Sequence, residues 1–181
     1  PTVSIGGETY YVVTTPITSN KTLTSDRKWY ASGGVFVNDG ITLTIEAGTK
    51  VYAADDGTTP FISILRGGKI MAEGDASNPI VLTTIKSVTG GASAGDWGGL
   101  ILNGRATINI GSTAEGEGGT GTYGGSMDSD DSGVLRYVRV EYAGKILGTD
   151  NELNGFSFNA VGSQTVLEHL QAYRGADDGF E

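Results

Sequence analysis

The chain has 181 residues, a net charge of -9 and no cysteine. This length suits one domain with a hydrophobic core, and the absence of cysteine excludes disulfides. The acidic balance argues against nucleic acid, whose phosphates require clustered Lys and Arg. No run of about 18 apolar residues is present, so we expect no transmembrane segment. Thirty glycines and only four prolines predict an all-β fold, because its many bends need residues that tolerate positive φ.

The first 29 residues contain two strand-like pieces, at 9–14 and 21–24, separated by Pro16 and a polar turn. We expect this segment to be a lead-in that caps the fold. The first coil of a solenoid exposes unpaired strand edges and apolar core, and an atypical N-terminal segment can cover them.

Residues 34–53 compress three short strands into twenty residues. Apolar side chains alternate at Val35 and Val37, and Gly40 and Gly48 interrupt the pattern where the chain has to bend. The alternation resumes at Ile41, Leu43, Ile45 and Val51. This stretch is typical of one coil of a solenoid.

Similar short strands, which we call rungs, follow along the chain. They are predicted at residues 61–65, 69–73, 80–84, 95–104 and 106–110, the last with Ile108 and Ile110 in phase. Repeated units of 20 to 50 residues indicate a solenoid, in which neighbouring coils must stack to bury their apolar faces.

Residues 111–133 interrupt this rhythm with a Gly- and Asp-rich sequence that is almost free of apolar side chains. We therefore expect a surface insert that adds nothing to the core. Long loops of this kind cost little closure entropy and are places where function concentrates.

The clearest internal repeat follows the insert. Residues 134–142 (VLRYVRVEY) align with residues 166–173 (VLEHLQAY), with one residue fewer in the later copy. If the copies stack about 4.8 Å apart in register, Arg136 meets Glu168 and Tyr137 meets His169. The single histidine is then a stacked surface ring.

A resemblance that covers nearly the whole chain rests on five sequence segments: DGITLTIEAGTKVYA, GGKIMAEGDASNPIVLTT, GDWGGLILNGRATIN, GVLRYVRVEYAG and GADDGFE. With them the chain resembles secreted or cell-surface right-handed parallel β-helix proteins of Gram-negative bacteria. The resemblance implies one right-handed β-helix domain over residues 1–181, in an extracellular or cell-surface location. It also implies a module of a larger exported protein, so we expect these residues to be a fragment.

The acidic part of the insert is a candidate calcium site formed by Asp128, Asp130, Asp131 and Ser132. Oxygen side chains at alternating positions, with glycine at the sixth, follow the logic of a calcium loop. The match is partial, because the twelfth position is Arg139 where an EF-hand has Glu. A solvated acidic turn is the alternative.

Asp177 and Asp178, with Glu181, form a second cation candidate. In a strand, adjacent residues point to opposite faces, so the two Asp side chains converge only in a turn. A simple corner, in which Asp tolerates an unusual φ, is the alternative.

Three residues are candidate ligand contacts. Trp97, which lies between an Asp and two glycines, suits stacking on a sugar ring or, alternatively, filling a corner of the core. Arg139 and Arg174 suit ligand binding or, alternatively, outward rungs that pair with acidic neighbours.

These observations favour a non-catalytic extracellular module, structural or adhesive, stiffened by calcium. Its expected partners are glycans, other surface proteins or further copies of itself. Two alternatives stay open: a polysaccharide lyase or hydrolase acting on acidic glycans, which rests on fold analogy alone, and a self-assembling extracellular fibre subunit.

Overall fold

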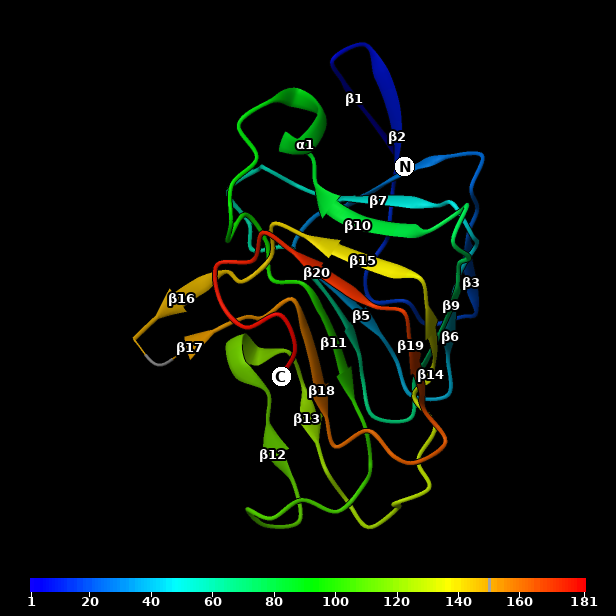
Figure 1. Ribbon diagram of the computed structural model, residues 1–181, viewed down its shortest axis with the longest axis vertical. Helices are drawn as coiled ribbons and strands as arrows, with labels where there is room; N and C mark the ends of the chain where they lie inside the picture. The colour runs from blue at the N-terminus through cyan, green and yellow to red at the C-terminus, as the bar shows by residue number, and fades with distance from the viewer. Residues whose placement is uncertain (150) are drawn as a thin grey trace.

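The computed structural model describes residues 1–149 and 151–181, whose regular secondary structure is almost entirely β-strand (Figure 1). Three sheets with parallel pairing carry the fold. Sheet A contains β1 (Thr2–Ile5), β2 (Glu8–Val12), β4 (Lys28–Ala31), β7 (Lys50–Ala53), β10 (Ile80–Thr84), β15 (Val138–Glu141) and β20 (Gln171–Tyr173). Sheet B contains β5 (Gly34–Val37), β8 (Phe61–Ile64), β11 (Leu100–Asn103) and β18 (Phe156–Asn159). Sheet C contains β3 (Lys21–Leu23), β6 (Thr42–Ile45), β9 (Lys69–Glu73), β14 (Gly133–Arg136) and β19 (Val166–Glu168).

Residues 34–53 form one coil, as predicted, because β5, β6 and β7 each join a different sheet. Gly40 and Gly48 have φ values of 73° and 78°, which explains why glycine stands at these bends. The following strands visit the sheets in the same order: β8, β9, β10; then β11, β14, β15; then β18, β19, β20. Each coil therefore adds one strand to every sheet.

The core lies between the sheets and consists of stacked apolar side chains. In sheet B, Val35 pairs with Ile62, Ile62 with Leu100, and Leu100 with Phe156, and none is more than 2% exposed. Burying a side chain of this size stabilises a fold by roughly 1.5–3 kcal/mol. Because the same position is apolar in successive coils, one continuous core runs through the stack.

The predicted pairing of the internal repeat is confirmed. Arg136 pairs with Glu168, and the Tyr137 and His169 rings stack with centroids 4.3 Å apart. The register continues unbroken to the end of the later copy, where Glu141 pairs with Tyr173. Tyr142 therefore corresponds to Arg174, and both have positive φ, at 60° and 53°.

The N-terminal residues form a hairpin, of which only the second strand was predicted from the sequence. β1 pairs antiparallel with β2 around Gly6 and Gly7, whose φ values are 59° and 83°. A two-residue Gly-Gly loop between alternating strands is a known hairpin signal. β2 in turn pairs with β4 and extends sheet A.

The prediction of a rung at residues 106–110 is wrong. This stretch contains no strand, and Ile110 is 67% exposed. Alternation over five residues does not distinguish a rung from a turn when the chain then leaves the coil. The described residues contain one short α-helix, α1 (Lys86–Thr89), and no helix among them is long and apolar enough to span a membrane.

The Gly- and Asp-rich insert folds back onto the molecule. It contains β12 (Ala114–Glu115), the 3-10 turn η1 (Glu117–Gly119) and β13 (Thr122–Tyr123), and β12 pairs antiparallel with β13. Thr120 is only 1% exposed, since the insert packs on the outer face of sheet B. A second small hairpin, β16 (Ile146–Gly148) and β17 (Asn151–Glu152), lies nearby.

Candidate functional site

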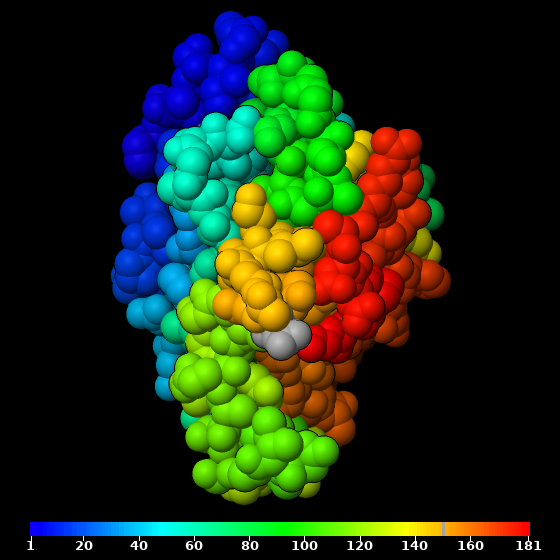
Figure 2. Space-filling model, turned by 90° about the vertical axis from the view of Figure 1, so that its left-hand side faces the viewer, coloured from blue at the N-terminus to red at the C-terminus, as the bar shows by residue number. Residues whose placement is uncertain are grey.

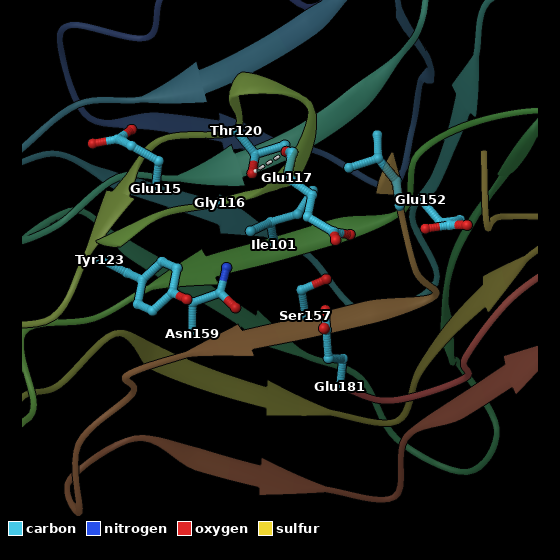
Figure 3. Close-up of a pocket in the computed structure, with 11 residues that line it drawn as sticks. Ile101, Glu115, Gly116, Glu117, Thr120, Tyr123, Glu152, Ser157, Asn159 and Glu181 are labelled. Carbon is cyan, nitrogen blue, oxygen red and sulfur yellow. Dashed lines mark hydrogen bonds between the residues drawn. The ribbon is translucent and has the colours of Figure 1, made fainter. Parts of the chain in front are cut away.

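A pocket of about 240 Å³ lies on the outer face of sheet B, and we call it the acidic pocket. Its floor is formed by β11 and β18, and its walls by the insert and β17 (Figure 3). It is lined by Ile101, Glu115, Gly116, Glu117, Thr120, Tyr123, Glu152, Leu153, Ser157, Asn159 and Glu181. Figure 2 shows the surface around it, where the insert, β16–β17 and the C-terminal residues meet on one side of the molecule.

Hydrogen bonds to sheet B hold the insert over this pocket. The Ser63 hydroxyl and the Asn103 amide both donate to the Thr120 carbonyl oxygen, at 2.6 and 3.0 Å. The Thr120 hydroxyl donates to the Glu117 carbonyl oxygen at 2.8 Å. The Gly118 N–H donates to Asn151 Oδ1 at 3.1 Å, which connects η1 to β17. The backbone of Glu117 is thereby fixed at the edge of the pocket.

The floor of the pocket follows from the alternation of the strands. Ile101 pairs with Ser157 and Asn103 with Asn159, so these four residues lie on the outer face while Leu100 and its partner fill the core. Asn159 Nδ2 donates to Asn103 Oδ1 at 3.1 Å. The outer face of sheet B is therefore polar at the points where a ligand could reach it.

Four glutamates give the pocket its charge. Figure 3 shows Glu117, Glu152 and Glu181 toward one end and Glu115 toward the other, beside Tyr123. Glu115 Oε1 accepts a hydrogen bond from Thr122 Oγ1 at 2.6 Å, and Glu181 Oε2 accepts one from Asn154 Nδ2 at 2.7 Å.

Glu117 is the glutamate most affected by its surroundings. Desolvation at the pocket wall raises its pKa, and repulsion from Glu181 and Glu152 raises it further. A hydrogen bond from the backbone of Glu152 opposes these effects without cancelling them. Glu117 therefore binds a proton more readily than a glutamate in free solution.

The chemistry of the lining favours ligands that donate hydrogen bonds. Carboxylates are acceptors only, and the described lining includes no Lys, Arg or His side chain. Sugar hydroxyls or a cationic group suit such a pocket. A uronate carboxylate would be repelled by the glutamates at close range.

The predicted calcium residues of the insert lie outside the acidic pocket, and each has a different partner. Asp128 Oδ1 accepts from the Thr107 N–H at 2.9 Å, and Ser132 donates to Asp130 Oδ2 at 3.1 Å. Asp131 forms an ion pair with Lys69 and accepts from the Gly133 N–H. Within residues 1–149 and 151–181, no group of three or more His, Cys, Asp or Glu side chains could hold a metal ion. Calcium at this loop stays a prediction that would need ligands beyond these carboxylates.

The alternative of a solvated acidic turn does not fit Asp130, which is only 5% exposed. Asp177 and Asp178, by contrast, are both exposed in the loop after β20. The Asp178 carbonyl accepts from the Gly155 N–H at 2.9 Å, and the charge of Asp177 adds slightly to the upward pKa shift of Glu117. The structure thus brings the second acidic cluster close to the acidic pocket.

The three predicted ligand contacts are not brought together. Trp97 is 2% exposed, so its ring offers no face to a sugar, and its Nε1 donates to the Glu141 carbonyl at 2.7 Å. The core-corner interpretation of Trp97 is the one that fits. Arg139 lies on sheet A, bonded to Gln171 Oε1 at 2.7 Å and Glu141 Oε1 at 3.2 Å. Arg174 is exposed, with its guanidinium over the Tyr173 ring.

Of the residues that form the acidic pocket, Glu181 was named from the sequence as part of the second cation candidate, but nothing in the sequence joined it to the others. The acidic residues of the insert indicated charge without a location. The missing information is long-range, because the insert is positioned by Ser63, which lies 57 residues before Thr120.

Comparison with known proteins gives one match. The model of a family described as the pectate-lyase-like β-helix domain matches residues 15–181. No curated protein and no solved structure matches the chain.

Proposed function

Because the chain belongs to the pectate-lyase-like β-helix family, we propose that it is a non-catalytic extracellular module of a bacterial surface, which contacts glycans through the acidic pocket. In this proposal the stack is a right-handed solenoid, since parallel crossovers are almost always right-handed. Residues 1–29 cap its first coil.

The observation that carries the proposal is the lining of the acidic pocket. Glu115, Glu117 and Glu152 present acceptors, Tyr123 adds an aromatic ring, and Asn159 adds a side-chain amide. Carboxylate, amide and aromatic groups in a shallow polar hollow suit the hydroxyls and apolar faces of sugars. Asn159 is part of sheet B, and the hydrogen bonds from Ser63 and Asn103 hold the insert over it, so less conformational freedom is lost on binding.

The test is a binding measurement with glycans of different charge. Isothermal titration with neutral, uronate-containing and amino-sugar oligosaccharides should show binding of the neutral or amino-sugar forms and little binding of the uronate forms. Glu152→Gln should weaken binding, whereas Glu46→Gln, an exposed position after β6 of sheet C that does not line the acidic pocket, should not. Preferential binding of uronate oligosaccharides would overturn the proposal.

A second candidate, a glycan hydrolase, is favoured by one observation. Glu117 has a raised pKa and shares its pocket with other carboxylates. A protonated carboxyl beside an ionised one is the arrangement that glycosidases use as general acid and nucleophile or base. A lyase acting on acidic glycans fits less well, since the glutamates repel its substrate.

One experiment separates the two candidates. Purified protein is incubated with the glycans that it binds, and new reducing ends are measured. The module releases none, and its Glu117→Gln variant still binds. Release of reducing ends that is lost in Glu117→Gln would establish the hydrolase.

Calcium stabilisation belongs to the same proposal and is tested separately. The acidic loop at residues 128–132 is the site to examine. A melting temperature that rises with calcium, and no longer rises in Asp128→Ala, would support it. Equal melting in calcium and in chelator would remove calcium from the proposal.

A further inference from the structure

A second pocket lies on the outer face of sheet A, next to α1, and we call it the sheet A pocket. It has a volume of about 230 Å³. Its lining combines ionic, hydroxyl and apolar groups: Lys50, Tyr52, Val81, Thr83, Ser87, Val88, Arg139 and Glu141. It shares no lining residue with the acidic pocket, so any function of it is independent of the one proposed above.

The strand register brings these side chains together. Lys50 pairs with Val81, and Val81 with Arg139, across three neighbouring strands. Two residues further along, Tyr52 pairs with Thr83, and the same register places Glu141 on the other side of Thr83. Residues two apart in a strand share a face, so both rows point outward from the core.

The wall of the sheet A pocket is fixed before any ligand arrives. Lys86 Nζ forms ion pairs with Asp55 at 3.3 Å and Asp96 at 3.1 Å, which hold the α1 segment over the sheet. Arg139 is held between Gln171 and Glu141. A hollow whose groups are already positioned binds with less loss of conformational entropy.

Thr83 is the observation that points to a ligand. It is only 3% exposed, and its Oγ1 is buried with no hydrogen-bond partner among the residues that the structure describes. Buried hydroxyls are nearly always paired, because an unpaired one loses its bond to water without replacement. A ligand hydroxyl in the sheet A pocket would supply the missing partner.

The surrounding groups select the chemistry of that ligand. The Arg139–Glu141 pair offers donors and acceptors side by side, and the Glu141 side chain is only 14% exposed. Arg139 neutralises this carboxylate, and Lys50, the remaining charge of the lining, is exposed to water, so the lining does not require an ionised ligand. Val81 and Val88 suit the C–H face of a ring. We propose that the sheet A pocket binds one neutral sugar unit through Thr83, Arg139 and Glu141.

The test is a titration of the whole chain with the methyl glycosides of glucose, galactose and mannose, followed by saturation-transfer NMR, with methyl glucuronate as the acidic probe. Wild-type protein should bind at least one neutral glycoside. Thr83→Val, which keeps the shape and removes the hydroxyl, should weaken that binding about tenfold or more. Thr44→Val, an outward position on sheet C, is the matched control and should bind as wild type does.

A melting measurement shows whether Thr83→Val changes the stability of the fold or only the pocket. Since Thr83 Oγ1 has no partner in the fold, Thr83→Val should melt at the same temperature as wild type or higher. A clear drop would mean that the hydroxyl has a structural role, and would overturn the proposal. Unchanged binding by Thr83→Val, tighter binding of methyl glucuronate, or binding lost in Glu152→Gln instead would each overturn it as well.

Discussion

At the scale of single residues, Gly133 has a backbone that other residues avoid. It begins β14 with φ of 112°, and a Cβ there would overlap the carbonyl oxygen of Ile70 in the neighbouring strand. Gly40 also has positive φ, at 73°, but a Cβ there would meet no atom within 4 Å. Substitutions at Gly40 and Gly133 therefore distinguish the cost of backbone strain alone from the cost of strain together with steric overlap.

We predict that Gly40→Ala lowers the free energy of unfolding by about 1 kcal/mol, from strain alone. Gly133→Ala should lower it by about 3 kcal/mol or more, because overlap with the backbone adds to the strain. Urea unfolding followed by circular dichroism measures both. Equal midpoints for the two variants would show that the strand beside Gly133 can move aside.

Glu117 gives a prediction about pH. Its pKa in the folded chain is raised above the ordinary value of a glutamate by desolvation and by repulsion from Glu181 and Glu152. The folded state therefore holds this proton more tightly than the unfolded state, and its contribution to stability is lost as the pH rises from about 4.5 through the folded pKa.

Glu117→Gln removes the ionisable group, so the loss of stability with rising pH should disappear. The variant should melt at a higher temperature than wild type at pH 7, and the difference should shrink as the pH falls toward 4. Added salt at pH 7 should also reduce the difference, because the repulsion at this exposed site is screened. Melting curves across pH 4 to 7 make the measurement. A difference that does not vary with pH would contradict the electrostatic explanation.

At the scale of elements, the insert depends on Asn103 of β11. This residue is 1% exposed, and its Nδ2 donates to the Thr120 carbonyl at 3.0 Å and to Ser63 Oγ at 3.1 Å. Its Oδ1 accepts from Asn159. One side chain thus joins the insert to two strands of sheet B.

We predict that Asn103→Ala costs about 1–3 kcal/mol, since it leaves buried polar groups short of partners. It should also loosen the insert, so that chymotrypsin cleaves at Tyr123 faster than in wild type. Asn159→Ala, which loses only one of these bonds, is the control and should have a smaller effect on both measurements. Unchanged cleavage in Asn103→Ala would mean that other contacts hold the insert.

The elements that were predicted correctly are those whose signals are local. Val35 and Val37 alternate, and Gly40 and Gly48 mark the bends, so one coil is recognisable within twenty residues. The acidic pocket depends instead on contacts between distant parts of the chain, such as that between Thr120 and Ser63. The side chains that form those contacts are small and polar, and such residues look the same in a free loop as in a packed one.

At the scale of the whole molecule, the two pockets lie on different sheets, while the core behind them is shared. One cluster of buried residues runs from Val13 through Phe156 and includes Trp29 in β4 and Trp97 before β11. When each coil of a stack contacts only its neighbours, the ends can unfold separately if the interfaces between coils are weak. Here apolar residues continue through every interface, which favours one cooperative unit.

The two tryptophans report on this cooperativity, because they lie in different coils and are the only two in the chain. In Trp97→Phe the fluorescence follows Trp29 in β4, near the N-terminal end of the stack, and in Trp29→Phe it follows Trp97, which precedes β11. We predict that in each variant the urea midpoint by fluorescence equals the midpoint by circular dichroism, as two-state unfolding requires. Comparing two probes within one variant removes the effect of the substitution on overall stability. A Trp29 signal that disappears at lower urea than the dichroism would show that the N-terminal coils detach first, and that the stack unfolds in steps.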